Sequence, residues 1–254
     1  MELLRRVRPG APGRRVTVRA AAGPADDLPT GDAKRERVRA MFERIAPRYD
    51  LMNRLMTGGL DRRWRHRAMA CIGPGPGERV LDLACGTGDL AALAAARGAR
   101  VVGVDFTVAM LRRARARLPE AALVRADAAR LPFTDGSVDA AVCGFALRNL
   151  VEREPVLREL RRVLRPGGRV ALLDAGRPRN PLLRRAHGLV LDGVVPRLGS
   201  WLSDREAYRY LPRSTAYLPD PGAVTRELEG AGFAATGFEV LALGAAWMWW
   251  GRRP

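Results

Sequence analysis

The strongest constraint on the fold is a regular alternation of short apolar segments and amphipathic segments that begins at Arg79. The apolar segments predict five strands, at 79–84, 100–104, 122–126, 139–143 and 169–174. Between them, apolar residues at helical spacing predict helices at about 88–97, 107–117 and 152–164. Short strands that alternate with helices form βαβ units, which build a parallel sheet. The chain therefore predicts a doubly wound, Rossmann-like α/β fold.

Further elements flank this alternating core. Apolar residues at helical spacing predict helices within 33–72, at 35–45 and 61–71, on either side of a Gly58-Gly59 break. Two adjacent apolar segments near the end predict an antiparallel pair of strands, at 233–240 and 243–250, which brings the sheet to seven strands.

Two regions lie outside the predicted core. Residues 178–220 predict a helical insertion that forms a cap on the substrate side, before the last two strands. Residues 1–32 mix Arg, Pro, Gly and Ala without periodicity and predict a disordered arm. A single domain is therefore expected over 33–254.

Composition excludes several classes of protein. No apolar run is long enough for a transmembrane helix, and the arginine-rich N-terminal region lacks the apolar segment of a signal peptide. Cys71, Cys85 and Cys143 have neither paired spacing nor neighbouring histidines, so a reduced cytoplasmic setting is expected, without disulfides or a zinc site. The net charge of +17 suits an anionic membrane, nucleic acid or an acidic cofactor as a partner, or marks a solvated basic face.

A glycine-rich turn in the segment Val80–Leu90 predicts a ligand site. Gly86 and Gly88 let the backbone approach a ligand closely at the N-terminus of the helix that follows. Their spacing also fits a dinucleotide fingerprint, whose ligand is a pyrophosphate. Asp82 lies inside the preceding strand and favours a ligand with a free ammonium group instead. S-adenosylmethionine has that group, a sulfonium and no phosphate.

Acidic residues also close the next two predicted strands. Asp105 can accept both hydroxyls of a ribose, a contact that either class of cofactor would use. Asp127 can reach the amino group of an adenine. Each acid alone is more typical of a helix N-cap or a turn. Three acids in three successive strands predict a cofactor site.

Three further segments are distinctive: Tyr49-Asp-Leu-Met-Asn53, Leu147-Arg-Asn149 and Tyr208-Arg-Tyr-Leu-Pro212. Together with the glycine turn and the Arg165-Pro-Gly-Gly168 turn, they resemble class I S-adenosylmethionine-dependent methyltransferases. More narrowly, they resemble the family that C-methylates the ring of menaquinone and ubiquinone precursors. The two turns are shared by most class I methyltransferases, whereas the three segments are specific to the quinone family.

The resemblance implies which residues bind the cofactor S-adenosylmethionine. These are Asp82, Gly86, Thr87, Gly88, Asp105, Phe106, Asp127, Ala128 and Gly144. Some family members have a serine in place of Gly144, so this contact is expected to be absent or made by the backbone. The likeness implies no metal.

The resemblance also implies catalytic residues near the substrate ring, namely Tyr49, Arg148 and Asn149. Arg148 would stabilise a developing phenolate, as fixed positive charge does for an oxyanion. An ion pair of Arg148 with Glu152 or Glu154 is the structural alternative. His66 and His187 lie outside the motifs and are expected at the surface, so no general base is identified.

The implied reaction is transfer of a methyl group from a sulfonium to a ring carbon of demethylmenaquinol. The ring must be reduced, because a deprotonated hydroxyl makes the carbon nucleophilic, and alignment of the reacting atoms then supplies much of the rate. Two departures from the family, Ala146 and the pair Asp174-Ala175, are expected to face the substrate. They leave 2-polyprenyl-6-methoxy-1,4-benzoquinol, or another phenolic or lipid acceptor, as alternatives. An arginine-rich nucleic-acid-binding protein and a nicotinamide reductase are alternatives from other classes.

The prenyl tail of such a substrate predicts peripheral contact with a membrane. The apolar segment 181–202 carries Arg184, Arg185 and Arg197, which would suit anionic lipid, although core packing explains its leucines equally well. The partners expected are therefore a prenylated quinol and an anionic membrane surface. No nucleic acid is expected, and a homodimer is left open.

Overall fold

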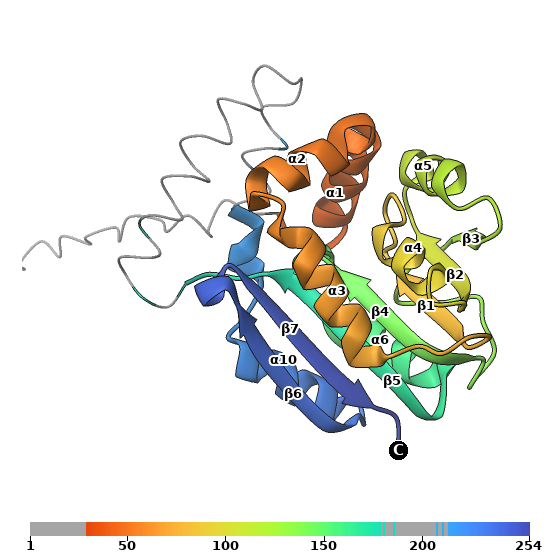
Figure 1. Ribbon diagram of the computed structural model, residues 1–254. Coiled ribbons are helices and arrows are strands. Elements are labelled where there is room, and N and C mark those ends of the chain that lie inside the picture. Colours follow the sequence, from red (N-terminus) through yellow and green to blue (C-terminus); the bar gives the residue numbers. More distant parts are fainter. Residues whose placement is uncertain (1–28, 179, 181–184, 186–206, 208–209, 211–212) are drawn as a thin grey trace, which may run out of the picture.

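The computed structural model describes residues 29–178, 180, 185, 207, 210 and 213–254 (Figure 1). The arm predicted for 1–32 lies outside this range up to residue 28, and most of the cap predicted for 178–220 lies outside it too. Gly31 and Asp32 already belong to the first helix. The predicted boundary of the arm at residue 32 therefore lies two residues inside that helix.

A mixed sheet of seven strands forms the centre of the protein. The strands are β1 (Arg79–Leu83), β2 (Arg100–Asp105), β3 (Ala122–Arg125), β4 (Val138–Gly144), β5 (Leu164–Ala175), β6 (Ala234–Leu241) and β7 (Ala246–Arg252). Their order is β3-β2-β1-β4-β5-β7-β6. Strands β1 to β5 are parallel, and β7 runs antiparallel to both of its neighbours. The doubly wound fold with a final antiparallel pair is therefore confirmed.

The strand order has a consequence for ligand binding. The chain winds outward in both directions from β1 and β4, so the connections on the two sides lead away from a crevice between them. In open α/β sheets, ligands bind at such a switch point, beyond the carboxyl ends of the strands. Strands β1 and β4 are buried along most of their length, as parallel strands covered on both faces are.

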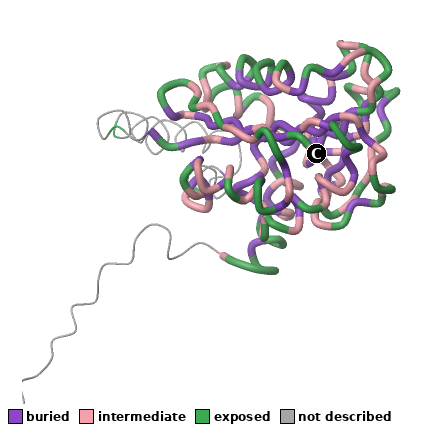
Figure 2. The backbone as a smooth tube through the Cα atoms, turned by 90° about the horizontal axis from the view of Figure 1, so that it is seen from below, coloured by how far each residue is buried: buried purple, intermediate pink, exposed green. Residues whose placement is uncertain are grey.

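Helices cover both faces of the sheet (Figure 1). Helices α3 (Leu60–Ile72) and α4 (Asp89–Ala95) bury their apolar residues on one face, and α6 (Arg153–Val163) and α10 (Pro221–Gly230) on the other. In α6 the buried residues are Val156, Leu157, Leu160 and Val163, the stripe expected of an amphipathic helix. Figure 2 shows this layering as a buried interior with exposed residues outside.

The structure differs from the sequence-based prediction in several details. The last strand was predicted at 243–250 and begins instead at Ala246, because a 3-10 turn over Ala242–Gly244 places Leu243 in the left-handed region, with φ 57°. Helix α10 was not predicted, although its start is readable. Asp220 accepts a hydrogen bond from the backbone nitrogen of Gly222, and proline occupies the first helical position.

The N-terminal helices α1 (Gly31–Ile45) and α2 (Tyr49–Thr57) lie above the carboxyl ends of the strands, with helix α5 (Val108–Arg117) beside α1 (Figure 1). Lys34 anchors the start of α1, since its Nζ donates to the Leu150 carbonyl oxygen at 2.6 Å and lies 3.7 Å from the centre of the Tyr217 ring. Burial lowers the pKa of Lys34 to about 8. Among the described residues, no helix is long and apolar enough to cross a bilayer.

Candidate active site

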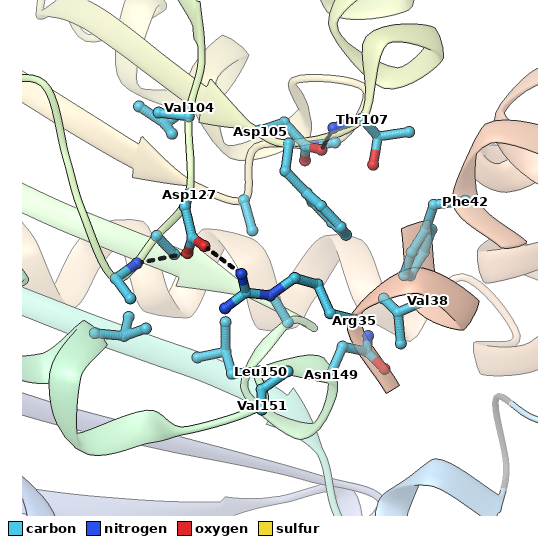
Figure 3. A pocket seen from close by; sticks show the side chains of 18 of the residues that line it. Arg35, Val38, Phe42, Val104, Asp105, Thr107, Asp127, Asn149, Leu150 and Val151 are labelled. Carbon is cyan, nitrogen blue, oxygen red and sulfur yellow. Dashed lines mark hydrogen bonds and ion pairs between the residues drawn. The ribbon is translucent and has the colours of Figure 1, made fainter. Parts of the chain in front are cut away.

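A pocket of about 410 Å³ opens where β1, β2, β3 and β4 end, and α1 and the start of α2 form its opposite wall (Figure 3). This volume is typical of a small-molecule site. The predicted site residues that line it are Tyr49, Gly86, Asp105, Phe106, Asp127, Ala128, Gly144 and Asn149. The other four predicted residues, Asp82, Thr87, Gly88 and Arg148, do not line it.

Two residues of the pocket wall hold an unusual backbone conformation. Ala84 follows β1 with φ 53°, and Phe145 follows β4 with φ 61°. Residues other than glycine seldom occupy this left-handed region, and they cluster at functional sites. The Phe145 nitrogen donates to the Leu173 carbonyl oxygen at 2.6 Å, which fixes the turn. These two residues flank the switch point of the sheet and were not predicted from the sequence.

Asp105 joins the end of β2 to the glycine turn. Its Oδ2 accepts from the backbone nitrogen of Gly86 at 2.9 Å, and its Oδ1 accepts from that of Thr107 at 2.8 Å. Burial raises the pKa of Asp105, and these two hydrogen bonds oppose the shift. A carboxylate oxygen accepts more than one hydrogen bond. Asp105 can therefore hold the turn and still accept hydroxyl groups from a ligand.

Asp127 lies at the end of β3 and faces α1 across the pocket. Its Oδ1 accepts from the Ala129 nitrogen at 2.9 Å, and its Oδ2 lies 3.3 Å from a guanidinium nitrogen of Arg35, which projects from α1 (Figure 3). Both side chains of this ion pair are about half exposed, so the pair is worth under about 1 kcal/mol. A ligand that binds Asp127 can therefore displace Arg35 at a small cost in free energy. Arg35 was not predicted from the sequence.

Asp82 lines a small hollow of about 20 Å³ beside the main pocket, and Tyr49, Ala84, Gly86 and Gly144 line both spaces. The Asp82 Oδ2 accepts from the Ala91 nitrogen at 2.8 Å. Its Oδ1 is buried and has no hydrogen-bond partner within the described part of the chain. Burial raises the pKa of Asp82 to about 8. An unpaired carboxyl oxygen in this position fits a cationic group of a ligand.

Thr87 and Gly88 stabilise the glycine turn. The Thr87 hydroxyl donates to Asp50 Oδ1 at 2.6 Å, and so connects the turn to α2. Gly88 has φ 85°, and a Cβ there would lie 3.2 Å from Leu118 and 3.4 Å from Ala114. Gly88 therefore faces the packing between α4 and α5 and lines neither space.

Arg148 does not line the pocket. Its guanidinium is buried in an ion pair with Asp174, and its Nε donates to the Ser214 hydroxyl at 3.1 Å. The Arg148 backbone nitrogen also donates to Asp174 Oδ2 at 3.0 Å. The alternative of an ion pair with Glu152 or Glu154 was therefore wrong, because the acid at the end of β5 is nearer.

Asp174 was also misplaced by the sequence analysis. It was expected to face the substrate, but its side chain is fully buried against Arg148 and does not line the pocket. Ala146, the other departure from the family pattern, does line the pocket, as expected. The pair of Asp174 with Arg148 joins two segments that are far apart in the sequence, so no local signal could have identified it.

Two uncharged polar side chains complete the wall. Asn149 Oδ1 accepts from the Tyr210 hydroxyl at 3.4 Å. Burial raises the pKa of Tyr49, so its hydroxyl is protonated at neutral pH. No histidine of the described ranges lines the pocket: His66 is exposed on α3, and His187 lies outside those ranges. Within the same ranges, no cluster of His, Cys, Asp and Glu is placed to hold a metal ion.

Comparison with known proteins gives relatives over nearly the whole chain. The sequence profile of the ubiE/COQ5 methyltransferase family matches residues 30–253. The demethylmenaquinone methyltransferase of Roseiflexus sp. (strain RS-1) is 42% identical over 224 residues, which cover 86% of this chain and 94% of that protein. The ubiquinone/menaquinone biosynthesis C-methyltransferase UbiE of Syntrophotalea carbinolica is 43% identical over 201 residues, 77% of this chain and 85% of that protein.

Solved structures agree on the fold. Phosphoethanolamine N-methyltransferase 2 of Haemonchus contortus, in complex with S-adenosyl-L-methionine, superposes with a TM-score of 0.57 at 16% identity. The match covers 74% of this chain and 52% of that chain, so this protein spans about half the length of that enzyme. At this identity the likeness supports the class I methyltransferase fold.

Proposed function

Because this chain belongs to the ubiE/COQ5 methyltransferase family, we propose that it transfers a methyl group from S-adenosylmethionine to a ring carbon of demethylmenaquinol. The observation that carries the proposal is the unpaired, buried Oδ1 of Asp82, next to a pocket where Asp105 and Asp127 end successive strands. A pyrophosphate would be repelled by these three acids. An ammonium group, a ribose and an adenine are complementary to them.

The residues of this chain fit the cofactor as follows. Asp82 would accept a hydrogen bond from its ammonium group, and Asp105 would accept hydrogen bonds from the hydroxyls of its ribose. Asp127, Ala128 and the Phe106 ring would lie beside its adenine. The cofactor supplies a methyl group that is already activated by the sulfonium, so what the protein must provide is alignment with the acceptor carbon.

Packing and backbone conformation require glycine at two positions of the pocket wall. A Cβ at Gly144 would lie 2.6 Å from Leu90, and Gly86 has φ 55°, so neither position accepts a larger residue without movement. Thr87 lines the small hollow together with Asp82, and its hydroxyl donates to Asp50 and so holds the turn in shape. Gly88 acts only indirectly, through its packing against α5.

Tyr49 and Asn149 are the groups that we assign to the acceptor ring, since both line the pocket. Arg148 is a positioning residue in this proposal. Its pair with Asp174 fixes the short 3-10 helix Leu147–Asn149, and this helix carries Asn149 into the pocket wall. Because Asp174 neutralises its guanidinium, Arg148 supplies no net positive charge to a phenolate form of the substrate.

The acceptor is a prenylated quinol, so the enzyme must reach a substrate dissolved in lipid. We therefore also propose that it works at the surface of a membrane. The high net charge of +17 supports an anionic surface. A benzoquinol remains the second candidate acceptor, because relatives at similar identity carry the name of a ubiquinone/menaquinone biosynthesis enzyme.

The test is an anaerobic assay with S-adenosylmethionine and chemically reduced demethylmenaquinol, read by mass spectrometry of the extracted quinone. Oxidised demethylmenaquinone and 2-polyprenyl-6-methoxy-1,4-benzoquinol are run in parallel. We expect a mass gain of one methyl group with demethylmenaquinol and none with its quinone. Product from the benzoquinol alone would move the assignment to ubiquinone synthesis, and product from neither would reject a quinol as substrate.

A further inference from the structure

Helix α2 is apolar on two opposite faces. Its inner face carries Tyr49 and Met52, which pack towards the pocket and a core cluster shared with α1. Its outer face carries Leu51 and Leu55, which are 47% and 46% exposed. Residues four apart are neighbours on a helix surface, so these two leucines form one patch. A solvent-facing helix surface is ordinarily polar, and this one is not.

A further exposed leucine follows the end of α2. The Gly59 nitrogen donates to the Arg54 carbonyl oxygen at 2.9 Å, which folds the chain back tightly before α3 begins. Leu60, the first residue of α3, is 37% exposed. We call Leu51, Leu55 and Leu60, with the arginines described next, the outer face of α2.

The charge on this outer face has one sign. Arg54, Arg62 and Arg63 are exposed, and no acidic side chain of the described residues forms an ion pair with them. The two acidic residues of this stretch, Asp50 and Asp61, form ion pairs with arginines from outside it or within the core. The combination of exposed leucines and unpaired arginines is typical of a helix that lies in a membrane interface.

The position of the outer face matches the path that a lipid substrate must take. Tyr49 of the same helix lines the pocket, so the pocket and the outer face lie on opposite sides of one short helix. Figure 1 shows α2 above the carboxyl ends of the strands, at the end of the protein remote from its C-terminus. Docking through α2 would bring the pocket to the bilayer surface.

We propose that the outer face of α2 docks on an anionic lipid bilayer, with the leucines in the interface and the arginines on acidic headgroups. The value of such docking rests on the proposed function, but the binding itself needs neither cofactor nor quinol. Three leucines are few for a dimer, since a stable interface buries about 1,000 Å² or more. Nucleic acid would be complementary to the arginines but not to the leucines between them.

The experiment is sedimentation of the full chain with sucrose-loaded vesicles of phosphatidylglycerol and phosphatidylcholine in equal parts, and with vesicles of phosphatidylcholine alone. Two variants alter the outer face, L51Q/L55Q and R54Q/R62Q/R63Q. The matched control is F238Q/V240Q, because these side chains are 40% and 49% exposed on β6, at the far edge of the sheet. Circular dichroism and the Kd for S-adenosylmethionine report whether each variant is folded.

We expect the wild-type chain and F238Q/V240Q to sediment with the anionic vesicles and not with the neutral ones. Each arginine near an anionic surface contributes roughly fivefold to binding, so the triple variant should bind about a hundredfold more weakly. The leucine variant should also lose binding. Equal binding of folded wild type and L51Q/L55Q would overturn the proposal, as would loss confined to the control.

Failure of this proposal is distinguishable from failure of the proposed function. Methyl transfer to a quinol with a truncated, water-soluble tail should be the same in wild type and in L51Q/L55Q. A chain that binds anionic vesicles but methylates no quinol would contradict the assigned substrate only. A chain that methylates the soluble quinol but ignores vesicles would contradict the docking surface only.

Discussion

The buried pair of Arg148 and Asp174 makes a sharp prediction about stability. The Asp174 side chain is fully buried and that of Arg148 nearly so. Replacement of Asp174 by alanine leaves the guanidinium buried without a counter-charge, and breaking a buried pair in this way costs about 3–5 kcal/mol. The backbone nitrogens of Arg148 and Ala175 also lose their acceptor. Because a domain is stable by only about 5–15 kcal/mol, Asp174→Ala should lose a large part of its free energy of unfolding.

The partner variants separate the pair from its surroundings. Replacement of both residues by apolar ones of similar volume, R148M/D174L, removes the charges together, and such exchanges are often neutral. We therefore expect the double variant to be more stable than either R148M or D174L alone. Its activity should remain low, because the position of the Leu147–Asn149 turn depends on the pair.

The assay is urea unfolding at pH 7, followed by far-ultraviolet circular dichroism, on the wild type and the R148M, D174L and R148M/D174L variants. The coupling free energy from this cycle should exceed about 2 kcal/mol, since residues in one buried network couple by 0.5 to about 3 kcal/mol. Additive effects, or single variants that lose under about 1 kcal/mol, would refute the description of the pair as buried and mutually dependent.

Three further predictions concern the pocket and the helices around it. Because the pKa of Asp82 is raised to about 8, the free protein holds a proton there that its unfolded chain releases, so the free energy of unfolding should fall as the pH rises from about 4 to 8. Binding of an ammonium group should expel this proton, so the affinity for S-adenosylmethionine should rise with pH up to about 8. Calorimetry in buffers of different ionisation enthalpy should detect the released proton at pH 7. Asp82→Asn should abolish the rise of affinity with pH. Glu43 of α1 accepts hydrogen bonds from the backbone nitrogens of Val108 and Ala109 at the start of α5. Glu43→Ala should therefore lower the thermal unfolding temperature by the equivalent of about 1 kcal/mol. An unchanged unfolding temperature would show that these contacts do not cap α5. Arg35→Ala should alter the Kd for S-adenosylmethionine by less than about fivefold, because its half-exposed pair with Asp127 is weak, and a larger loss of affinity would mean that Arg35 contacts the cofactor itself.

The fold was readable from the sequence where local pattern and burial agree. The alternation of strands and helices from Arg79 onwards predicted the parallel sheet, because each of these strands has a short apolar core and the helices between them have apolar residues at helical spacing. The exact start of β7 could not be predicted, since it depends on the left-handed backbone conformation of Leu243, and leucine does not favour that conformation. Helix α2 was also missed, because its apolar residues lie on two faces and show no single stripe.

The candidate site divides in the same way. Asp105 and Asp127 end strands, and the topology alone brings strand ends together, so their place in the pocket was predictable. Arg35 and Asp174 were missed or misplaced, because each acts across a tertiary contact between segments that are distant in the sequence. The left-handed backbone at Phe145 is likewise held by the hydrogen bond from its nitrogen to the Leu173 carbonyl oxygen on the neighbouring strand. The spacing of residues in the sequence does not predict this hydrogen bond.

The assignment of the pocket to the cofactor is tested most directly by a crystal structure of the protein with S-adenosylhomocysteine, the demethylated product. It should show the amino group of the ligand at Asp82 Oδ1, both ribose hydroxyls on the Asp105 carboxylate, and the adenine between Phe106 and Asp127. A ligand bound elsewhere, or one bound here with Asp82 Oδ1 still unpaired, would contradict the account.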